Sequence, residues 1–147
     1  MSAVVVSAAP TLLLDTNAAI AVIRGRPPQV RERLRQARAD GRTLAVSTVT
    51  LYELWYGVAR SGRVAENTER LEAFLAGDVG LVDFDAEHAA EAAGVRARLE
   101  AAGRPIGPYD VMLAAQALVM GATLVTANVG EFARVAGLAW EDWTADA

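Results

Sequence analysis

Residues Ile106–Met120 read Ile-Gly-Pro-Tyr-Asp-Val-Met-Leu-Ala-Ala-Gln-Ala-Leu-Val-Met, and they predict a mostly apolar helix with one acid at its start. A helix that is apolar all round belongs inside a protein. Pro108 suits the first helical turn and Gly107 the turn before it, so Asp110 should lie near the helix N-terminus, where the dipole favours an anion. An acid that only stabilises a helix start would look the same, so Asp110 indicates a site only if other polar residues accompany it.

Strands and helices are expected to alternate on both sides of this helix. Short apolar runs predict buried strands at residues 11–14, 44–47, 81–84 and 121–126, with an edge strand at 138–140. Between them, the pattern predicts helices at residues 18–24, 51–58, 64–76 and 86–102, an arginine-rich helix between Pro28 and Gly41, and one turn at 129–134. Such alternation is typical of a three-layer α/β/α fold with a mostly parallel central sheet, here of four to five strands.

The length of 147 residues is that of a single domain, which we expect to occupy residues 11–147. Residues 1–10 contain no basic residue and lack the form of a signal peptide, so they are predicted to be a flexible N-terminal extension. No apolar run reaches the roughly 20 residues that span a bilayer. The absence of cysteine excludes disulfides, thiolate metal sites and cysteine nucleophiles, and it fits a cytoplasmic protein without membrane contact.

The basic residues are unusual because all 14 are arginine. The absence of lysine excludes the P-loop, Schiff-base enzymes and haloacid-dehalogenase-like phosphatases, whose sites need an ammonium group. A net charge of -4 argues against a general nucleic-acid coat, yet seven arginines lie in residues 24–42, against only Glu32 and Asp40. This cluster fits either phosphate binding or a solvated helix face.

Polar residues follow the predicted strands or begin the helices next to them. Asp15, Glu53, Asp110 and Asn128 are all expected at the carboxyl side of the sheet, where ligands collect in folds of this class. Two carboxylates about 4 Å apart repel by roughly 4 kcal/mol at an effective dielectric near 20, so several of them need a cation. Oxygen ligands without histidine or cysteine favour Mg²⁺ or Mn²⁺, and such a site favours metal-assisted hydrolysis of a phosphodiester.

Glu53 also has a purely structural interpretation, because the spacing Thr50-x-x-Glu53 matches a helix capping box. His88, the single histidine, is predicted to be a surface residue, because it has neither histidine partners for a metal nor an evident triad.

Four segments together resemble the successive motifs of PIN-domain ribonucleases, and most closely those of the VapC toxins of bacterial toxin–antitoxin modules. The segments are Leu13–Asn17, Ser47–Gly57, Arg104–Asp110 with Ala114 and Ala115, and Leu124–Phe132. Each is short, but the order and spacing of all four are specific, and the resemblance covers about residues 11–143.

The resemblance implies a PIN-like fold and a Mg²⁺-dependent endoribonuclease, with Mn²⁺ as a possible substitute, that cleaves structured RNA such as tRNA or rRNA. It also implies a homodimer neutralised by a VapB-like antitoxin, one of whose arginines would insert among the acids. Carried over by position, Asp15, Glu53 and Asp110 are the catalytic, metal-binding acids. The residues that would orient them or ligate weakly are Thr16, Asn17, Thr126 and Asn128.

The chain departs from the family pattern near its last motif. Asn128 stands where many relatives carry a fourth acid, so a second tightly held ion is in doubt. Ala127 and Gly130 stand where relatives often have arginine. Contacts with RNA are therefore expected from Arg24, Arg26 and Arg104.

Other functions remain open at this stage. The same acids would suit a non-cleaving RNA- or protein-binding module with a metal site, or a Mg²⁺-dependent DNA nuclease. The aromatic residues Trp55, Tyr56 and Trp143 are expected either in an interface with a partner or in the core.

Overall fold

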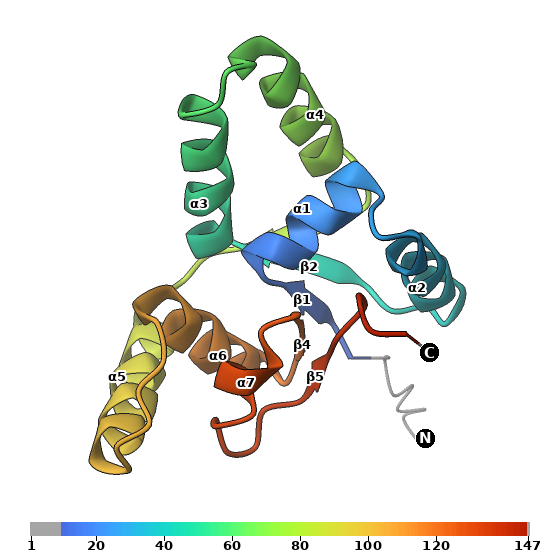
Figure 1. Ribbon diagram of the computed structural model, residues 1–147. Helices are drawn as coiled ribbons and strands as arrows, with labels where there is room; N and C mark the ends of the chain where they lie inside the picture. The colour runs from blue at the N-terminus through green and yellow to red at the C-terminus, as the bar shows by residue number, and fades with distance from the viewer. Residues whose placement is uncertain (1–9, 147) are drawn as a thin grey trace, which may run out of the picture.

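The computed structural model describes residues 10–146, in which a parallel sheet carries helices on both faces (Figure 1). The strand order is β3-β2-β1-β4-β5, and every neighbouring pair is parallel. The strands are β1 (Leu12–Leu14), β2 (Leu44–Ser47), β3 (Val79–Val82), β4 (Thr123–Val125) and β5 (Trp140–Glu141). The three-layer α/β/α fold with four to five parallel strands is thereby confirmed.

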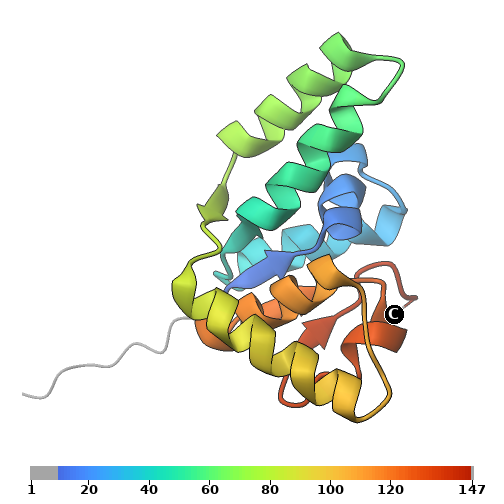
Figure 2. The ribbon, with the colours of Figure 1, turned by 90° about the vertical axis from the view of Figure 1, so that its left-hand side faces the viewer.

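Seven helices connect these strands within residues 10–146. They are α1 (Thr16–Arg24), α2 (Pro28–Ala39), α3 (Thr48–Ala59), α4 (Val64–Ala76), α5 (Ala86–Ala101), α6 (Pro108–Met120) and α7 (Val129–Phe132). Figures 1 and 2 show α1 to α4 on one side of the sheet and α5 to α7 on the other, with α3 and α4 projecting side by side away from it. None of the described helices is long and apolar enough to cross a membrane.

The central strand β1 is buried on both faces, which explains its uninterrupted leucines. Successive side chains of a strand point to opposite faces. Leu13 accordingly packs in the core under α5 and α6, whereas Leu12 and Leu14 pack in the core under α1 to α4. The strand β1 thus contributes leucines to both cores.

The direction of winding reverses at β1. The chain runs outward from β1 through β2 to β3, then crosses the sheet and adds β4 and β5 on the other side of β1. The carboxyl ends of β1 and β4 therefore lie side by side at a topological switch point, where open α/β sheets bind ligands. Asp15 follows β1 and Thr126 follows β4, so both lie at this point.

Two predicted strands have the wrong bounds. The third strand covers Val79–Val82 instead of 81–84, because Phe84 has already left the sheet and donates its backbone N–H to the Thr48 hydroxyl at 3.1 Å. The last strand is Trp140–Glu141 instead of 138–140, since Leu138 still closes a turn onto the carbonyl of Val135.

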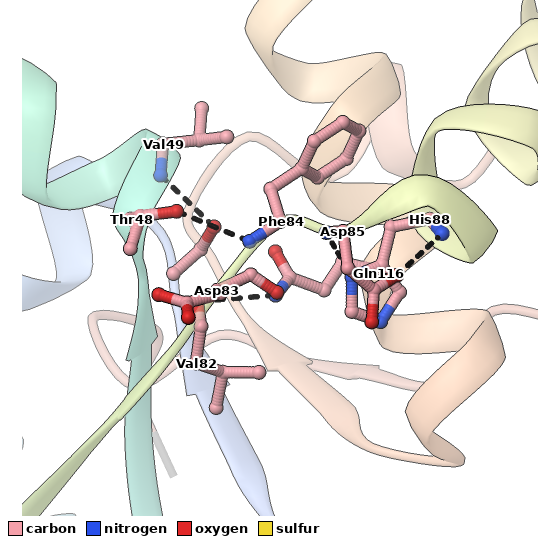
Figure 3. A network of polar contacts seen from close by, with 9 residues as sticks. Thr48, Val49, Val82, Asp83, Phe84, Asp85, His88 and Gln116 are labelled. Atoms are coloured by element: carbon pink, nitrogen blue, oxygen red, sulfur yellow. Dashed lines mark hydrogen bonds and ion pairs between the residues drawn. The ribbon is translucent and has the colours of Figure 1, made fainter.

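His88 is buried, with 5% of its surface exposed, and is not the surface residue that was predicted. Its Nδ1 accepts the backbone N–H of Asp85 at 3.0 Å, while the Asp85 carboxylate accepts the backbone N–H of His88 at 3.1 Å (Figure 3). The imidazole thus takes the part that glutamate usually has in a capping box at the start of α5. Gln116 of α6 is also buried and donates to the carbonyls of Val82 and Asp83, each at 3.3 Å (Figure 3).

The expected N-terminal extension falls on residues 1–10, of which residues 1–9 lie outside the described part of the chain. The described residues 10–146 include all the elements that surround the switch point.

Candidate functional site

Asp15 occupies the most constrained position of the site, between the end of β1 and the start of α1. It is the N-cap of α1, and its Oδ1 accepts the backbone N–H of Ala18 at 2.8 Å. Its own N–H donates to the carbonyl of Val125 at 3.0 Å. Only 6% of the residue is exposed, and burial raises its pKa although hydrogen bonds from Thr126 and Ala18 act in the opposite direction.

Glu53 reaches the site from α3 and is held by the start of α1. The Thr16 hydroxyl donates to Glu53 Oε1 at 2.7 Å. The alternative interpretation of Glu53, as part of a capping box with Thr50, is wrong, because the N-cap of α3 is Ser47, whose hydroxyl accepts the backbone N–H of Val49 at 3.0 Å. Thr50 is a buried helix residue, and its hydroxyl has no partner within the described residues. Glu53 is therefore not part of the cap of α3, and its side chain instead links α3 to the start of α1.

Asp110 lies in the first turn of α6, as its sequence predicts, and it is paired with a second acid from α7. The side-chain amide of Asn128 donates to Asp110 Oδ2 at 3.1 Å and to Glu131 Oε2 at 2.8 Å. Its backbone N–H donates to the Thr126 hydroxyl at 2.9 Å.

The charges of these acids act on one another. The pKa of Asp110 is raised from its ordinary value of 3.8 to about 7 by burial, by the hydrogen bond with Glu131, and by the charges of Glu131, Asp15 and Glu53. The pKa of Glu131 is lowered, chiefly by the same hydrogen bond with Asp110. Near neutral pH the two carboxyl groups therefore share a proton.

Glu131 is the site residue that the sequence reasoning missed. The fourth acid was expected at position 128, where this chain has asparagine. The structure places an acid three residues later, on the short helix α7, with Asn128 bridging it to Asp110. The spacing Asn128-x-x-Glu131 on a predicted turn is the signal that could have identified it, because residues three apart lie on one face of a helix.

The donor set fits a hard, hydrated cation. The carboxylates of Asp15, Glu53 and Asp110 lie within electrostatic reach of one another, and that of Glu131 lies within reach of Asp110. Among residues 10–146, however, no three acidic or histidine side chains already converge closely enough to hold one ion directly. Mg²⁺ suits this arrangement, since it typically keeps several of its waters and takes only one or two carboxylates.

The remaining candidate residues are divided between the acids and a neighbouring groove. Thr16 holds Glu53, and Thr126 contacts both Asp15 and Asn128. Asn17 is exposed and instead lines a groove of about 820 Å³ along α1, together with Arg24, Arg26 and Arg70. A second groove of about 260 Å³ between α1, α3 and α4 is lined by Arg24, Arg70 and Glu53 among others, so Arg24 borders both.

The arginine cluster resolves into two parts. Arg24 and Arg26 share the groove along α1, whereas Arg35 pairs with Glu32 at 2.5 Å on the solvated face of α2 and Arg42 pairs with Glu141 at 2.6 Å. Arg104 is exposed in the loop between α5 and α6. The three arginines expected to contact RNA thus do not form one patch.

The three aromatic residues left open by the sequence also differ. Trp143 is buried in the core under α1 to α4, and Trp55 is half-buried and packs against the same core. Tyr56 is exposed, and the guanidinium of Arg60 lies 5.5 Å from its ring centroid.

Comparison with known proteins gives the same result in sequence and in structure. The profile of the PIN domain matches residues 12–138. The chain is 39% identical over 132 residues to the tRNA(fMet)-specific endonuclease VapC of Shigella flexneri, covering 90% of this chain and 97% of that protein. It is 36% identical over 131 residues to ribonuclease VapC2 of Haemophilus influenzae, covering 89% and 96% of the two chains.

Solved structures share the fold at full length. VapBC2 of Rickettsia felis, bound to a DNA fragment from its promoter, matches with a TM-score of 0.83 at 34% identity, covering 90% of this chain and 98% of that one. DNA-bound VapBC of Salmonella typhimurium matches with a TM-score of 0.82 at 36% identity, covering 92% and 99%.

Proposed function

This chain belongs to the PIN-domain family, and on that premise we propose that it is a toxin endoribonuclease that hydrolyses phosphodiester bonds in structured RNA. Relatives named endonuclease or ribonuclease align with nearly its whole length. The observation that carries the proposal is that Asp15, Glu53 and Asp110 lie within electrostatic reach of one another at the switch point of the sheet. Burial, Glu131 and, to a smaller extent, the charges of Asp15 and Glu53 raise the pKa of Asp110 to about 7.

We propose Mg²⁺ as the cofactor, with Mn²⁺ able to replace it. Asp15 and Asp110 are the direct ligands in this proposal, and Glu53 and Glu131 complete the negative charge around them. A bound divalent ion supplies an acidified water and neutralises the charge that develops on the phosphodiester. The all-oxygen donor set and the proton shared by Asp110 and Glu131 support this assignment.

The chain's own residues hold the acids in position before substrate arrives. The backbone N–H of Ala18 fixes Asp15, the Thr16 hydroxyl fixes Glu53, and the Asn128 amide fixes Asp110 against Glu131. Each acid thus has at least one donor from a neighbouring element. Such prior orientation lowers the barrier, because little reorganisation is left for the reaction itself.

For the substrate we propose a tRNA or rRNA, recognised locally instead of through a general basic surface. The net charge of -4 offers little attraction to RNA at long range. Arg24 and Arg26 in the groove along α1, and Arg104 in the loop before α6, are the proposed phosphate contacts. The name of the Shigella relative favours tRNA within this class.

For partners we propose a VapB-like antitoxin and a second copy of the chain, in the cytoplasm. The solved relatives are complexes of VapB and VapC, and two of them hold DNA. An antitoxin arginine placed among Asp15, Glu53 and Asp110 would satisfy their charges bidentately and compete with the metal. A structure of the complex with these acids free of partner contacts would contradict this part of the proposal.

The deciding experiment is cleavage of a total RNA pool by the purified protein, with and without Mg²⁺, beside Asp110→Asn. A DNA duplex and a DNA single strand are incubated in parallel. Discrete RNA fragments that require both Mg²⁺ and Asp110 are expected. Cleavage of DNA alone would assign a DNA nuclease, and RNA binding without cleavage by folded, Mg²⁺-bound protein would assign a binding module; either result overturns the proposal.

A further inference from the structure

Two exposed tyrosines flank the acids of the site. Tyr52 directly precedes Glu53 on α3, and Tyr109 directly precedes Asp110 at the start of α6. They are 54% and 41% exposed, whereas Phe132 and Trp143 are buried. Although the two tyrosines are 57 positions apart in the sequence (109 minus 52), their ring centroids lie 5.9 Å apart. The fold therefore brings two aromatic side chains together at the edge of the site. Because both are exposed, they contribute little to the hydrophobic core.

The two rings are not stacked face to face. The ring planes are tilted by 51°, so neither ring covers the other as it would in a parallel stack. The two rings still pack against each other at the distance of an aromatic pair. Two side chains that already restrict each other lose little conformational entropy when a flat ligand binds to them.

We propose that Tyr52 and Tyr109 form a stacking platform for an unpaired nucleobase of the RNA, next to the bond that is cut. The inference rests on the proposed ribonuclease function, because the platform borders its acids. Unpaired bases are the part of an RNA that stacks on exposed aromatic side chains, whereas paired bases are already stacked on each other.

Charge also favours a base over a phosphate at this position. No arginine lies within four residues of Tyr52 or of Tyr109 along the chain, so the pair has no neighbouring positive charge in the sequence to offer a phosphate. Binding energy at the two rings has to come from an uncharged part of the substrate, and a nucleobase supplies it through its π face. Every base has such a face, so the platform selects an unpaired nucleotide and not a particular base. Cleavage is therefore expected in loops or single strands and not within a duplex.

The test uses a short single-stranded RNA that carries the fluorescent base 2-aminopurine, placed at successive positions. The RNA is bound to full-length protein with Asp110→Asn as background, so that it is not cut. Stacking on tyrosine is expected to quench the fluorescence at one or two adjacent positions. In this background, Tyr52→Ala and Tyr109→Ala should each remove quenching and weaken binding by about 5- to 150-fold, the range for one stacked base.

Three controls separate stacking from other roles. Tyr52→Phe and Tyr109→Phe keep the ring and should retain quenching, which a role of the hydroxyl would not allow. Tyr56→Ala removes an equally exposed tyrosine one helical turn along α3 and should leave RNA binding unchanged. Circular dichroism and Tm of each variant establish that the fold is intact.

The outcomes distinguish this inference from the function on which it rests. If the otherwise unmodified protein cleaves RNA but the alanine variants bind and cut it like wild type, the platform is wrong and the nuclease stands. If those variants lose only an antitoxin and not RNA, the rings serve a protein partner, and the inference is again wrong. If wild-type protein neither binds nor cleaves RNA, both proposals fail.

Discussion

Asp110 and Glu131 come from different helices and accept hydrogen bonds from one amide group, that of Asn128, at 3.1 and 2.8 Å. Two carboxylates so placed do not both ionise readily, and the pKa of Asp110 is accordingly raised to about 7 while that of Glu131 is lowered. The two carboxylates therefore repel each other when both are ionised, and a bound proton or cation removes this repulsion. The interaction between these two acids can therefore be measured without substrate, through the effect of pH on the stability of the protein.

The first prediction concerns the stability of the metal-free protein. A carboxyl group whose pKa is raised in the folded state binds its proton more tightly there than in the unfolded chain. Stability should therefore fall as the pH rises between the ordinary pKa of 3.8 and the raised value of about 7. Asp110→Asn removes this penalty. Above pH 7 with a chelator present, we expect its Tm to exceed that of wild type by about 2–4 °C, the shift for about 1 kcal/mol. The expected gain is no larger because Asp110 is partly exposed, so solvent screens much of the repulsion.

The control for this measurement is Asp78→Asn, which removes an exposed acid far from the site along the chain. It should leave the Tm and its pH dependence unchanged. The advantage of Asp110→Asn should also disappear at a pH well below 7, where wild-type Asp110 is already protonated. An advantage that is equal at all pH values would show that repulsion is not its cause.

The second prediction concerns Glu131. If this acid contributes to the site as proposed, Glu131→Gln should weaken Mg²⁺ binding and lower RNA cleavage by about 10- to 100-fold. It should also return the pKa of Asp110 towards its ordinary value, because Glu131 is the principal partner that raises it. Calorimetric titration with Mg²⁺ and the pH dependence of Tm are the two measurements. Glu87→Gln, an exposed acid of α5, is the matched control, and equal Mg²⁺ affinity in both variants would contradict the prediction.

Sequence patterns predict the frame of this site because each relies on local physics. A short apolar run followed by a polar residue identified β1 and placed Asp15 after it, and Gly107-Pro108 placed Asp110 in the first turn of α6. The alternation of elements then gave the parallel sheet and its ligand-binding edge. The roles of Asp15, Glu53 and Asp110 remain predictions that the mutants above will test.

Contacts between distant segments were beyond local patterns. Thr50-x-x-Glu53 has the spacing of a capping box, yet Ser47 caps α3 and Glu53 pairs with Thr16, which is 37 positions away. Glu131 was overlooked because its partner Asp110 belongs to another helix. In both cases the sequence shows the acid itself. It does not show the acid's hydrogen-bond partner, because tertiary packing determines which distant residue lies next to it.

The third prediction tests the contact between Thr16 and Glu53. Thr16→Val replaces a hydroxyl by a methyl group of similar size, so Glu53 loses the donor that fixes it at 2.7 Å. We expect cleavage to fall by about 10- to 100-fold, while the free energy of unfolding changes by only about 1 kcal/mol. Thr16→Ser keeps the hydroxyl and should recover most of the activity. A loss of activity that serine does not recover would assign the effect to packing.

The fourth prediction concerns the groove along α1. Arg24 borders both grooves beside the site, so Arg24→Ala should raise the KM for RNA with little change in kcat. If Arg24 contacts a phosphate, the slope of log KM against log salt should decrease by about one. Arg96→Ala, which removes an exposed arginine paired with Glu100 on α5, is the control and should leave both quantities unchanged. An unaltered salt slope in Arg24→Ala would remove this residue from the RNA contacts.

The last prediction separates structure from catalysis at His88. The sole histidine of a nuclease invites a catalytic interpretation, but its Nδ1 accepts the Asp85 N–H and its ring lies 5.8 Å from that of Phe84, under the start of α5. His88→Ala should therefore lower the free energy of unfolding by about 1–2 kcal/mol through loss of the cap. Under conditions in which the variant is still folded, its kcat should be unchanged. His88→Gln restores the usual capping-box acceptor and should recover part of that stability. Denaturant unfolding gives the first quantity and RNA cleavage the second. A fall in kcat in a fully folded His88→Ala variant would instead place the histidine in the reaction.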